Sequence, residues 1–128
     1  MTVHLFRVIL PVTDVDAAAR FYSSVFGLEG ERVSNGRHYF DCSGTIPAVV
    51  DPRAENLEFR PNVDHLYFSV DDVEATYEQA KAAGCEWLGD EISVRPWGER
   101  SFYARDPFGN PICFVQAGTE FIGGRFVP

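Results

Sequence analysis

Two stretches of the chain share one pattern of hydrophobic and polar positions. Each begins with a short apolar run typical of a β-strand, passes an acidic residue, and continues with helical periodicity. The first starts at residues 7–12 (RVILPV) and the second at residues 65–70 (HLYFSV), just under half a chain later. A repeat at this spacing predicts that one structural unit occurs twice in the chain.

Apolar residues recur at helical spacing over residues 15–26 and again over residues 73–83. This spacing predicts one amphipathic helix in each unit. A glycine follows each helical segment directly, Gly27 in the first unit and Gly84 in the second. Glycine tolerates the left-handed backbone at helix ends, so both helices are expected to end there.

Acidic residues stand where both helices begin, Asp14 before the first and Asp71 or Asp72 before the second. Such carboxylates accept hydrogen bonds from the free amides of the first helical turn. Asp71 and Glu74 also have the spacing of a capping box, with Asp in place of Ser or Thr. The two helix starts are therefore marked by side-chain chemistry as well as by periodicity.

Three further strand-like runs follow each helix. They span residues 28–33, 37–42 and 45–50 in the first unit, and residues 86–94, 100–105 and 111–116 in the second. Asn35-Gly36 is typical of a tight hairpin, and residues 106–110 (DPFGN) predict another turn. We therefore predict an α+β fold in which two βαβββ repeats form curved mixed sheets around a cleft. The repeats cover about residues 4–52 and 62–117 of a single domain, 1–128.

The remaining segments are a linker and a tail. Residues 51–63 carry several charges and prolines and are expected to connect the repeats. The tail from Gly118 to Pro128 contains two apolar pairs, Phe121-Ile122 and Phe126-Val127. An apolar patch of this kind packs either on a partner subunit or on its own domain, and the sequence leaves both alternatives open.

Composition and net charge limit the classes of molecule that are expected to bind the protein. The chain of 128 residues has a formal net charge of −8 and 14% aromatic residues. Nucleic acid is not expected as a partner, because phosphate binding needs clustered Lys and Arg. An acidic surface favours a cationic ligand, although net charge also serves solubility alone.

The sequence also indicates in which cellular compartment the protein is expected. No signal peptide or apolar run long enough for a membrane span is recognised. The three cysteines, Cys42, Cys85 and Cys113, form no CxxC pair. An odd number of unpaired thiols fits a reducing cytosol, so we expect a cytoplasmic protein with no membrane partner.

Several short motifs carry a resemblance to a known family. They are Val12-Thr13-Asp14, Phe21-Tyr22, Phe26-Gly27-Leu28, Asp64-His65, Val70-Asp71-Asp72 and Asp106-Pro107-Phe108-Gly109-Asn110. In this order and spacing the chain resembles the vicinal oxygen chelate superfamily of glyoxalases, bleomycin resistance proteins and dioxygenases, over roughly residues 4–120. Residues 96–102 (PWGERSF) most resemble the bleomycin-resistance branch.

The resemblance implies a set of four metal positions that can be tested residue by residue. Enzymes of the superfamily hold a divalent metal with two side chains from each half, on the first and last strands. The matching positions here are Arg7, about Ala48, His65 and Cys113. Arg7 is always protonated and repels a dication, which leaves His65 and the thiol of Cys113. Catalytic zinc usually has three protein ligands, so we expect no metal and no other cofactor.

The same positions and nearby aromatic residues form the predicted ligand site. Its residues are Arg7, Tyr39, Asp41, His65, Tyr67, Trp97 and Cys113. Arg7 suits a ligand carboxylate or phosphate, or else pairs with Asp41 inside the protein. His65 is the one candidate general acid or base, or else an interior histidine. Cys113 is either activated by a neighbouring cation or a small buried residue. Trp97 either forms a wall for a flat ligand or covers the sheet edge.

Three hypotheses for function follow. The first is a metal-independent protein of bleomycin-resistance type that binds a drug or metabolite, as a homodimer with clefts between half-units. The second is a metal-dependent glyoxalase-I-like lyase or isomerase, or an extradiol-type dioxygenase, with ligands from Asp41, His38 or a second chain. The third is a regulatory module whose cleft is filled by its own side chains. The sequence contains no P-loop, dinucleotide fingerprint or Ser-His-Asp order.

Overall fold

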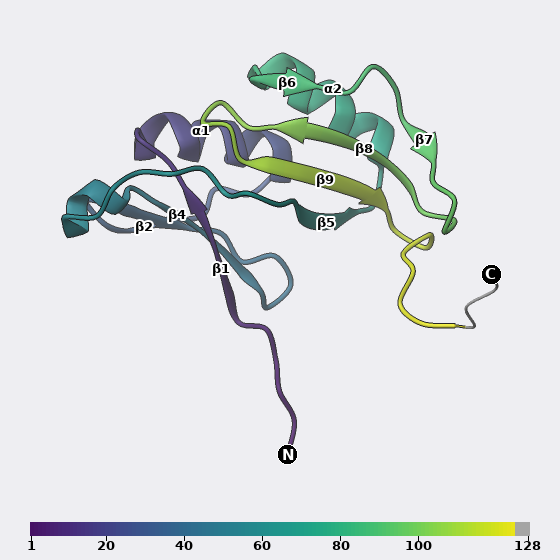
Figure 1. Ribbon diagram of the computed structural model, residues 1–128, viewed down its shortest axis with the longest axis horizontal. Coiled ribbons are helices and arrows are strands. Elements are labelled where there is room, and N and C mark those ends of the chain that lie inside the picture. The colour runs from purple at the N-terminus through teal and green to yellow at the C-terminus, as the bar shows by residue number, and fades with distance from the viewer. Residues whose placement is uncertain (125–128) are drawn as a thin grey trace.

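A computed structural model describes residues 1–124 and confirms the α+β fold of two βαβββ repeats (Figure 1). The first repeat contains β1 (Arg7–Pro11), α1 (Val15–Phe26), β2 (Glu31–Ser34), β3 (Arg37–Tyr39) and β4 (Ile46–Val50). The second contains β5 (Leu66–Val70), α2 (Val73–Ala83), β6 (Trp87–Leu88), β7 (Ser93–Val94), β8 (Arg100–Arg105) and β9 (Pro111–Gln116). A short 3₁₀ helix, η1 (Pro52–Glu55), lies in the segment between the repeats.

The two sheets have the same topology. The first has the strand order β1-β4-β3-β2 and the second β5-β9-β8-β6, with β7 also paired to β8. In each sheet the first strand runs parallel to the last strand of its repeat, and the other pairs are antiparallel. Each sheet thus holds an equivalent row of three residues: Ile9, Ala48 and Tyr39 in the first, and Tyr67, Cys113 and Tyr103 in the second.

Both helices begin at a capping aspartate and end at the expected glycine. Asp14 accepts a hydrogen bond from a first-turn amide at 3.0 Å, and Asp72 accepts one at 3.1 Å. The capping box predicted from Asp71 and Glu74 is wrong. Asp72 is the cap, and Glu74 forms an ion pair with Arg100 of β8 instead. A partner from a distant strand therefore takes the carboxylate that local spacing had assigned to the helix start.

One predicted strand of the second repeat is interrupted. Residues 86–94 form two short strands, β6 and β7, rather than one continuous strand. Between them, the hydroxyl of Tyr77 on α2 donates to the carbonyl oxygens of Gly89 at 2.7 Å and Asp90 at 3.2 Å. These bonds hold the intervening segment against the helix. Gly89 still donates to the Tyr103 carbonyl of β8 at 2.9 Å, and the ladder is interrupted after it.

Strands of the first repeat are also shorter than expected. β2 begins at Glu31 rather than at residue 28, and β3 ends at Tyr39 rather than at residue 42. Cys42 and Thr45 instead close a tight turn in which the Cys42 amide donates to the Thr45 carbonyl at 3.0 Å. The chain therefore reverses after Cys42, which keeps only an isolated bridge to Thr45 beyond the end of β3.

The two repeats share one hydrophobic core. Helices α1 and α2 lie side by side (Figure 1), and one face of each sheet packs into the same cluster of buried residues. Leu10 and Val49 come from the first sheet, and Phe102 and Phe114 from the second. By strand alternation, the opposite faces point away from this core. We call them the first outer face (Arg7, Ile9, Tyr39, Ala48) and the second outer face (His65, Tyr67, Ser101, Tyr103, Cys113).

The turn between β8 and β9 ties the halves together. The buried carboxylate of Asp106 accepts a hydrogen bond from the hydroxyl of Tyr22 on α1 at 2.6 Å. Asn110 donates to the carbonyl of Pro11 on β1 at 2.7 Å, and its side-chain oxygen accepts from the amide of Asn62 at 2.8 Å. Burial, and then the neighbouring Asp106, raise the pKa of Tyr22 well above its usual range. The phenol therefore stays protonated and keeps donating.

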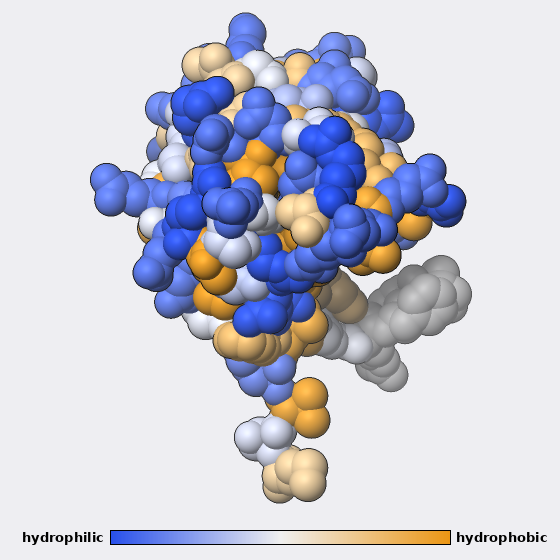
Figure 2. Space-filling view, turned by 90° about the vertical axis from the view of Figure 1, so that its left-hand side faces the viewer, coloured by the Kyte–Doolittle hydropathy of each residue, from blue (hydrophilic) through white to orange (hydrophobic). Residues whose placement is uncertain are grey.

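The surface is mixed in character, and the N-terminal segment projects from it (Figure 1). Figure 2 shows one side of the molecule as largely hydrophilic with scattered hydrophobic patches, below which the N-terminal segment extends. In the tail, Phe121 and Ile122 are mostly exposed, whereas Phe126 and Val127 lie outside the described residues. None of the helices in the described chain is long and apolar enough to cross a bilayer.

Candidate functional site

The second outer face presents a group of aromatic side chains. Tyr67 is 57% exposed, and Trp87 of β6 at the far edge is 50% exposed. Between them the rings of His65 and Tyr103 meet edge to face, with their centroids 5.0 Å apart. His65, Trp87, Tyr103 and Arg105 line an open depression of about 950 Å³. This face therefore offers both ring surfaces and polar groups to a small molecule.

Arg95 is a residue of this face that the sequence analysis missed. It lies just after β7, and its guanidinium is 4.6 Å from the centroid of the Tyr103 ring. Its Nε donates to the hydroxyl of Ser101 at 2.9 Å, and its Nη2 donates to the Ser101 carbonyl at 3.0 Å. The signal available in the sequence was its position next to the Pro96-Trp97 loop, which had been singled out.

Cys113 lies in the middle of this face but is only 1% exposed. It is in register with Tyr67 on one side and Tyr103 on the other. Burial raises the pKa of the Cys113 thiol to about 11, even though Ser101 and Arg95 act in the opposite direction. The thiol therefore stays protonated at neutral pH, which favours the buried-residue interpretation over an activated nucleophile.

The first outer face carries a second arginine stacked on a tyrosine. The guanidinium of Arg7 lies 4.9 Å from the ring centroids of both Phe6 and Tyr39. The pairing of Arg7 with Asp41 is absent, because the Asp41 carboxylate instead accepts from the amide of Gly44 at 2.7 Å. Within residues 1–124, Arg7 forms no ion pair and no hydrogen bond through its side chain.

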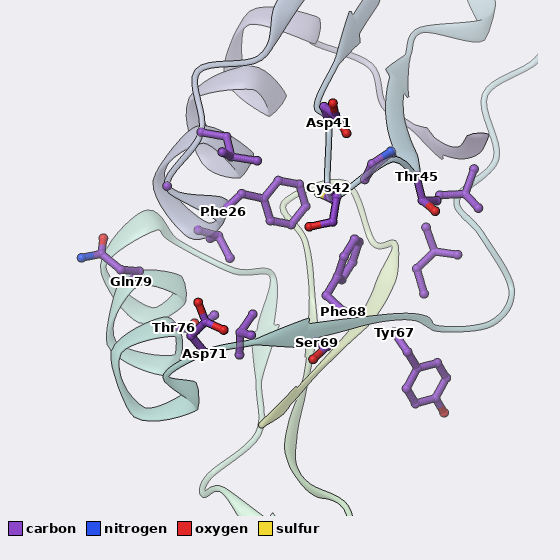
Figure 3. A pocket seen from close by; sticks show the side chains of 18 of the residues that line it. Phe26, Asp41, Cys42, Thr45, Tyr67, Phe68, Ser69, Asp71, Thr76 and Gln79 are labelled. Carbon is purple, nitrogen blue, oxygen red and sulfur yellow. The ribbon is translucent and has the colours of Figure 1, made fainter. Parts of the chain in front are cut away.

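Asp41 belongs to a different hollow, a groove between the two halves (Figure 3). The groove has a volume of about 1100 Å³, and the rings of Phe26 and Phe68 face each other in it with centroids 5.0 Å apart. Tyr67 borders the groove but points away from it, toward the second outer face (Figure 3). The predicted ligand residues are therefore divided among the two outer faces, this groove, which His65 also lines, and the loop that carries Trp97.

Trp97 lies in the loop between β7 and β8 and is 50% exposed. Its indole Nε1 donates to a carboxylate oxygen of Glu99 at 2.8 Å, which fixes the ring at the surface. The other two histidines are occupied elsewhere. His4 donates to the Gly44 carbonyl and His38 to the Glu29 carbonyl, each at 3.0 Å. Neither histidine belongs to an outer face with the predicted ligand residues.

The four metal positions of the superfamily do not fit a metal ion. Arg7 and the fully buried methyl group of Ala48 offer no lone pair from the first sheet. In the second sheet, His65 is accompanied by the protonated thiol of Cys113. No cluster of three or more His, Cys, Asp or Glu side chains suited to a metal occurs in the part of the chain that the structure describes.

Comparison with known protein families shows to which superfamily the chain belongs. A model of the Glyoxalase/Bleomycin resistance protein/Dioxygenase superfamily matches residues 4–114. This chain belongs to that superfamily. The match spans both repeats, from before β1 into β9, so the assignment covers the whole two-sheet core.

Individual members of the superfamily are similar over most of the chain. A glyoxylase-like domain-containing protein of Didymella fabae is 31% identical over 107 residues, which cover 79% of this chain and 84% of that protein. A glyoxalase-related enzyme from Fulvimarina pelagi shares the fold with a TM-score of 0.76 at 22% identity, over 94% and 92% of the two chains. A lactoylglutathione lyase from Agrobacterium tumefaciens has a TM-score of 0.68 at 25% identity, over 89% and 93%.

Proposed function

We propose that this member of the superfamily binds a small organic molecule on its second outer face without a metal ion. It acts by sequestering a drug or metabolite, as the bleomycin-resistance branch does, rather than by making or breaking bonds. The observation that supports this most is the aromatic and cationic group at the site itself. Tyr67, Tyr103, His65 and Arg95 surround Cys113, which occupies one of the metal positions of the superfamily.

A second copy of the chain completes the site in this proposal. The two outer faces belong to separate sheets that share a core through their opposite faces. Within residues 1–124, no hydrogen bond or ion pair joins a side chain of the first outer face to one of the second. A homodimer that places the first outer face of one copy over the second outer face of the other would enclose the ligand between them. It would also bring Arg7 and Arg95 to the same cleft.

The proposal is tested first by metal content. The purified protein is analysed by elemental mass spectrometry, before and after incubation with Zn, Ni, Mn and Fe(II) and desalting. We expect well below one metal ion per chain, because two of the four positions lack a lone pair. A thermal-shift screen of aromatic compounds of both charges should then give ligands that raise the melting temperature, since binding to the folded state stabilises it. The absence of any such ligand would count against the binding function.

The alternative is a metal-dependent enzyme. It is favoured by the similarity to the Agrobacterium lactoylglutathione lyase and by the presence of His65 at a metal position. About one metal ion per chain that is lost in the His65→Ala variant would support this alternative. The protein would then be assayed for isomerase and dioxygenase activity.

A further inference from the structure

We propose that the second outer face is selective for an aromatic carboxylate, whose anionic group pairs with Arg95 while its ring lies against Tyr67 and His65. The inference rests on the proposed function of this face as a small-molecule site. It goes beyond that function by assigning the charge of the ligand. It also differs from the expectation drawn from the net charge of −8, which favours a cationic ligand.

Arg95 is held in place before any ligand arrives. Two of its nitrogens, Nε and Nη2, donate to the hydroxyl and the carbonyl of Ser101, and Ser101 is 1% exposed. The flat guanidinium also lies 4.6 Å from the ring centroid of Tyr103. Within residues 1–124 its Nη1 has no hydrogen-bond partner. A fixed guanidinium with free N–H groups matches a planar carboxylate and loses little side-chain entropy on binding it.

The charge of Arg95 has no acidic partner in the described chain. Five other arginines form ion pairs with carboxylates: Arg32, Arg37, Arg53, Arg60 and Arg100. Near Arg95, Glu99 accepts instead from the indole of Trp97 and the amide of Phe121. Glu120 accepts from the hydroxyl of Ser69 and the amide of Gly118. The carboxylates of Glu99 and Glu120 are therefore hydrogen-bonded to neutral donors. The guanidinium of Arg95 remains available to an anionic ligand.

Besides the hydrogen-bonded carboxylates of Glu99 and Glu120, the groups around Arg95 are neutral hydrogen-bond donors and ring surfaces. Burial raises the pKa of Tyr103, so its phenol remains protonated and able to donate. The Cys113 thiol beside it is likewise protonated. Tyr67 is more than half exposed and lies with His65 at a centroid separation of 6.0 Å. A flat ring bound here would stack on exposed aromatic surface while its carboxylate reached the guanidinium. The local arrangement, rather than the net charge of the molecule, sets the preference.

The test uses three probes of the same shape and different charge: 2-naphthoate, 2-naphthamide and 2-naphthamidine. Dissociation constants are measured by isothermal titration calorimetry on the full chain and on two variants, Arg95→Gln and Arg20→Gln. Arg20 is an exposed residue of α1, so the second variant makes the same charge change away from the site. We expect wild-type protein and Arg20→Gln to bind naphthoate about tenfold or more tightly than naphthamide, and naphthamidine most weakly. Arg95→Gln should bind naphthoate and naphthamide equally.

Several outcomes separate the two proposals. Equal or tighter binding of the amide or amidine, or a carboxylate preference that survives Arg95→Gln, would overturn the anion selectivity and leave the binding function standing. Failure of naphthoate to bind while the broader thermal-shift screen yields other ligands would do the same. If the Arg95→Gln variant does not fold, the salt dependence of ligand affinity is measured on the wild-type protein instead. Naphthoate affinity should fall as NaCl rises from about 20 to about 500 mM while naphthamide affinity holds, and a salt-independent naphthoate affinity contradicts the proposal.

Discussion

Burial affects the pKa of the Cys113 thiol more than its polar and charged neighbours do. Arg95 and Ser101 lower the pKa of this thiol, yet burial outweighs them and brings it to about 11. Burial is also the largest cause that raises the pKa of Cys42 and Cys85, and a nearby aspartate raises each further. At the residue scale, then, all three thiols are stabilised in the protonated form by the fold.

We expect Cys113 to be unreactive near neutral pH. In a Cys42→Ser, Cys85→Ser double variant, iodoacetamide labelling of the folded protein followed by mass spectrometry should show little modification at pH 8. Because folding disfavours the thiolate, the stability that this thiol contributes is present below the unfolded pKa near 9 and is lost as pH rises toward about 11. The unfolding midpoint in urea should therefore fall over this interval. Rapid labelling with an apparent pKa below about 8 would show an activated thiol instead.

The start of α2 shows how elements compete for the same carboxylates. Two aspartates precede the helix, and spacing alone made Asp71 the partner of Glu74. The structure gives the cap to Asp72, which directly precedes the first helical residue, and Glu74 pairs with Arg100 of β8. Asp71 makes no side-chain hydrogen bond among the described residues, although its carbonyl accepts from Gln116 at 2.8 Å.

Adjacent aspartates provide a matched pair of variants for this element. Asp72→Ala should reduce the free energy of unfolding by about 1 kcal/mol, the usual cost of losing an N-cap. Asp71→Ala removes the same charge at the neighbouring position and should change it by less than about half that amount. Urea denaturation followed by circular dichroism measures both. Equal losses for the two variants would mean that the cap is not the cause.

At the scale of the whole molecule, the arrangement of the two sheets separates the predicted site residues. The helices and one face of each sheet form the shared core, so the outer faces cannot close on each other within one chain. Apolar side chains remain exposed on both outer faces, including Ile9 at 42% and Tyr67 at 57%. Such exposure on a sheet face is typical of a surface that a partner covers.

We therefore expect a dimer in solution. Sedimentation velocity at micromolar concentration should give twice the chain mass of 14.3 kDa. Ile9→Glu, which places a charge on the first outer face, should dissociate the dimer without loss of helical circular dichroism. Leu57→Glu in the linker, at a similarly exposed apolar position, should leave it intact. A monomeric wild-type protein would exclude the shared cleft.

The sequence by itself determined the elements that depend on local contacts. Periodicity and a following glycine located both helices, and Asn35-Gly36 located the first hairpin. The internal repeat predicted the matching topology of the two sheets. Alternation along β5 also placed His65 and Tyr67 on one face correctly, because residues two apart on a strand point the same way.

Only the tertiary structure decided which of several available partners certain side chains take. The break between β6 and β7 follows from Tyr77 on α2. Asp41 does not pair with Arg7, because its carboxylate accepts from the amide of Gly44 in the turn before β4. Arg95 joined the candidate site through Ser101 and Tyr103, both on β8. The physical reason is common to all three: each side chain takes the partner that the folded backbone brings within reach. That partner can be three residues away, as Gly44 is from Asp41, or twelve, as Gly89 is from Tyr77, and the spacing along the chain does not select it.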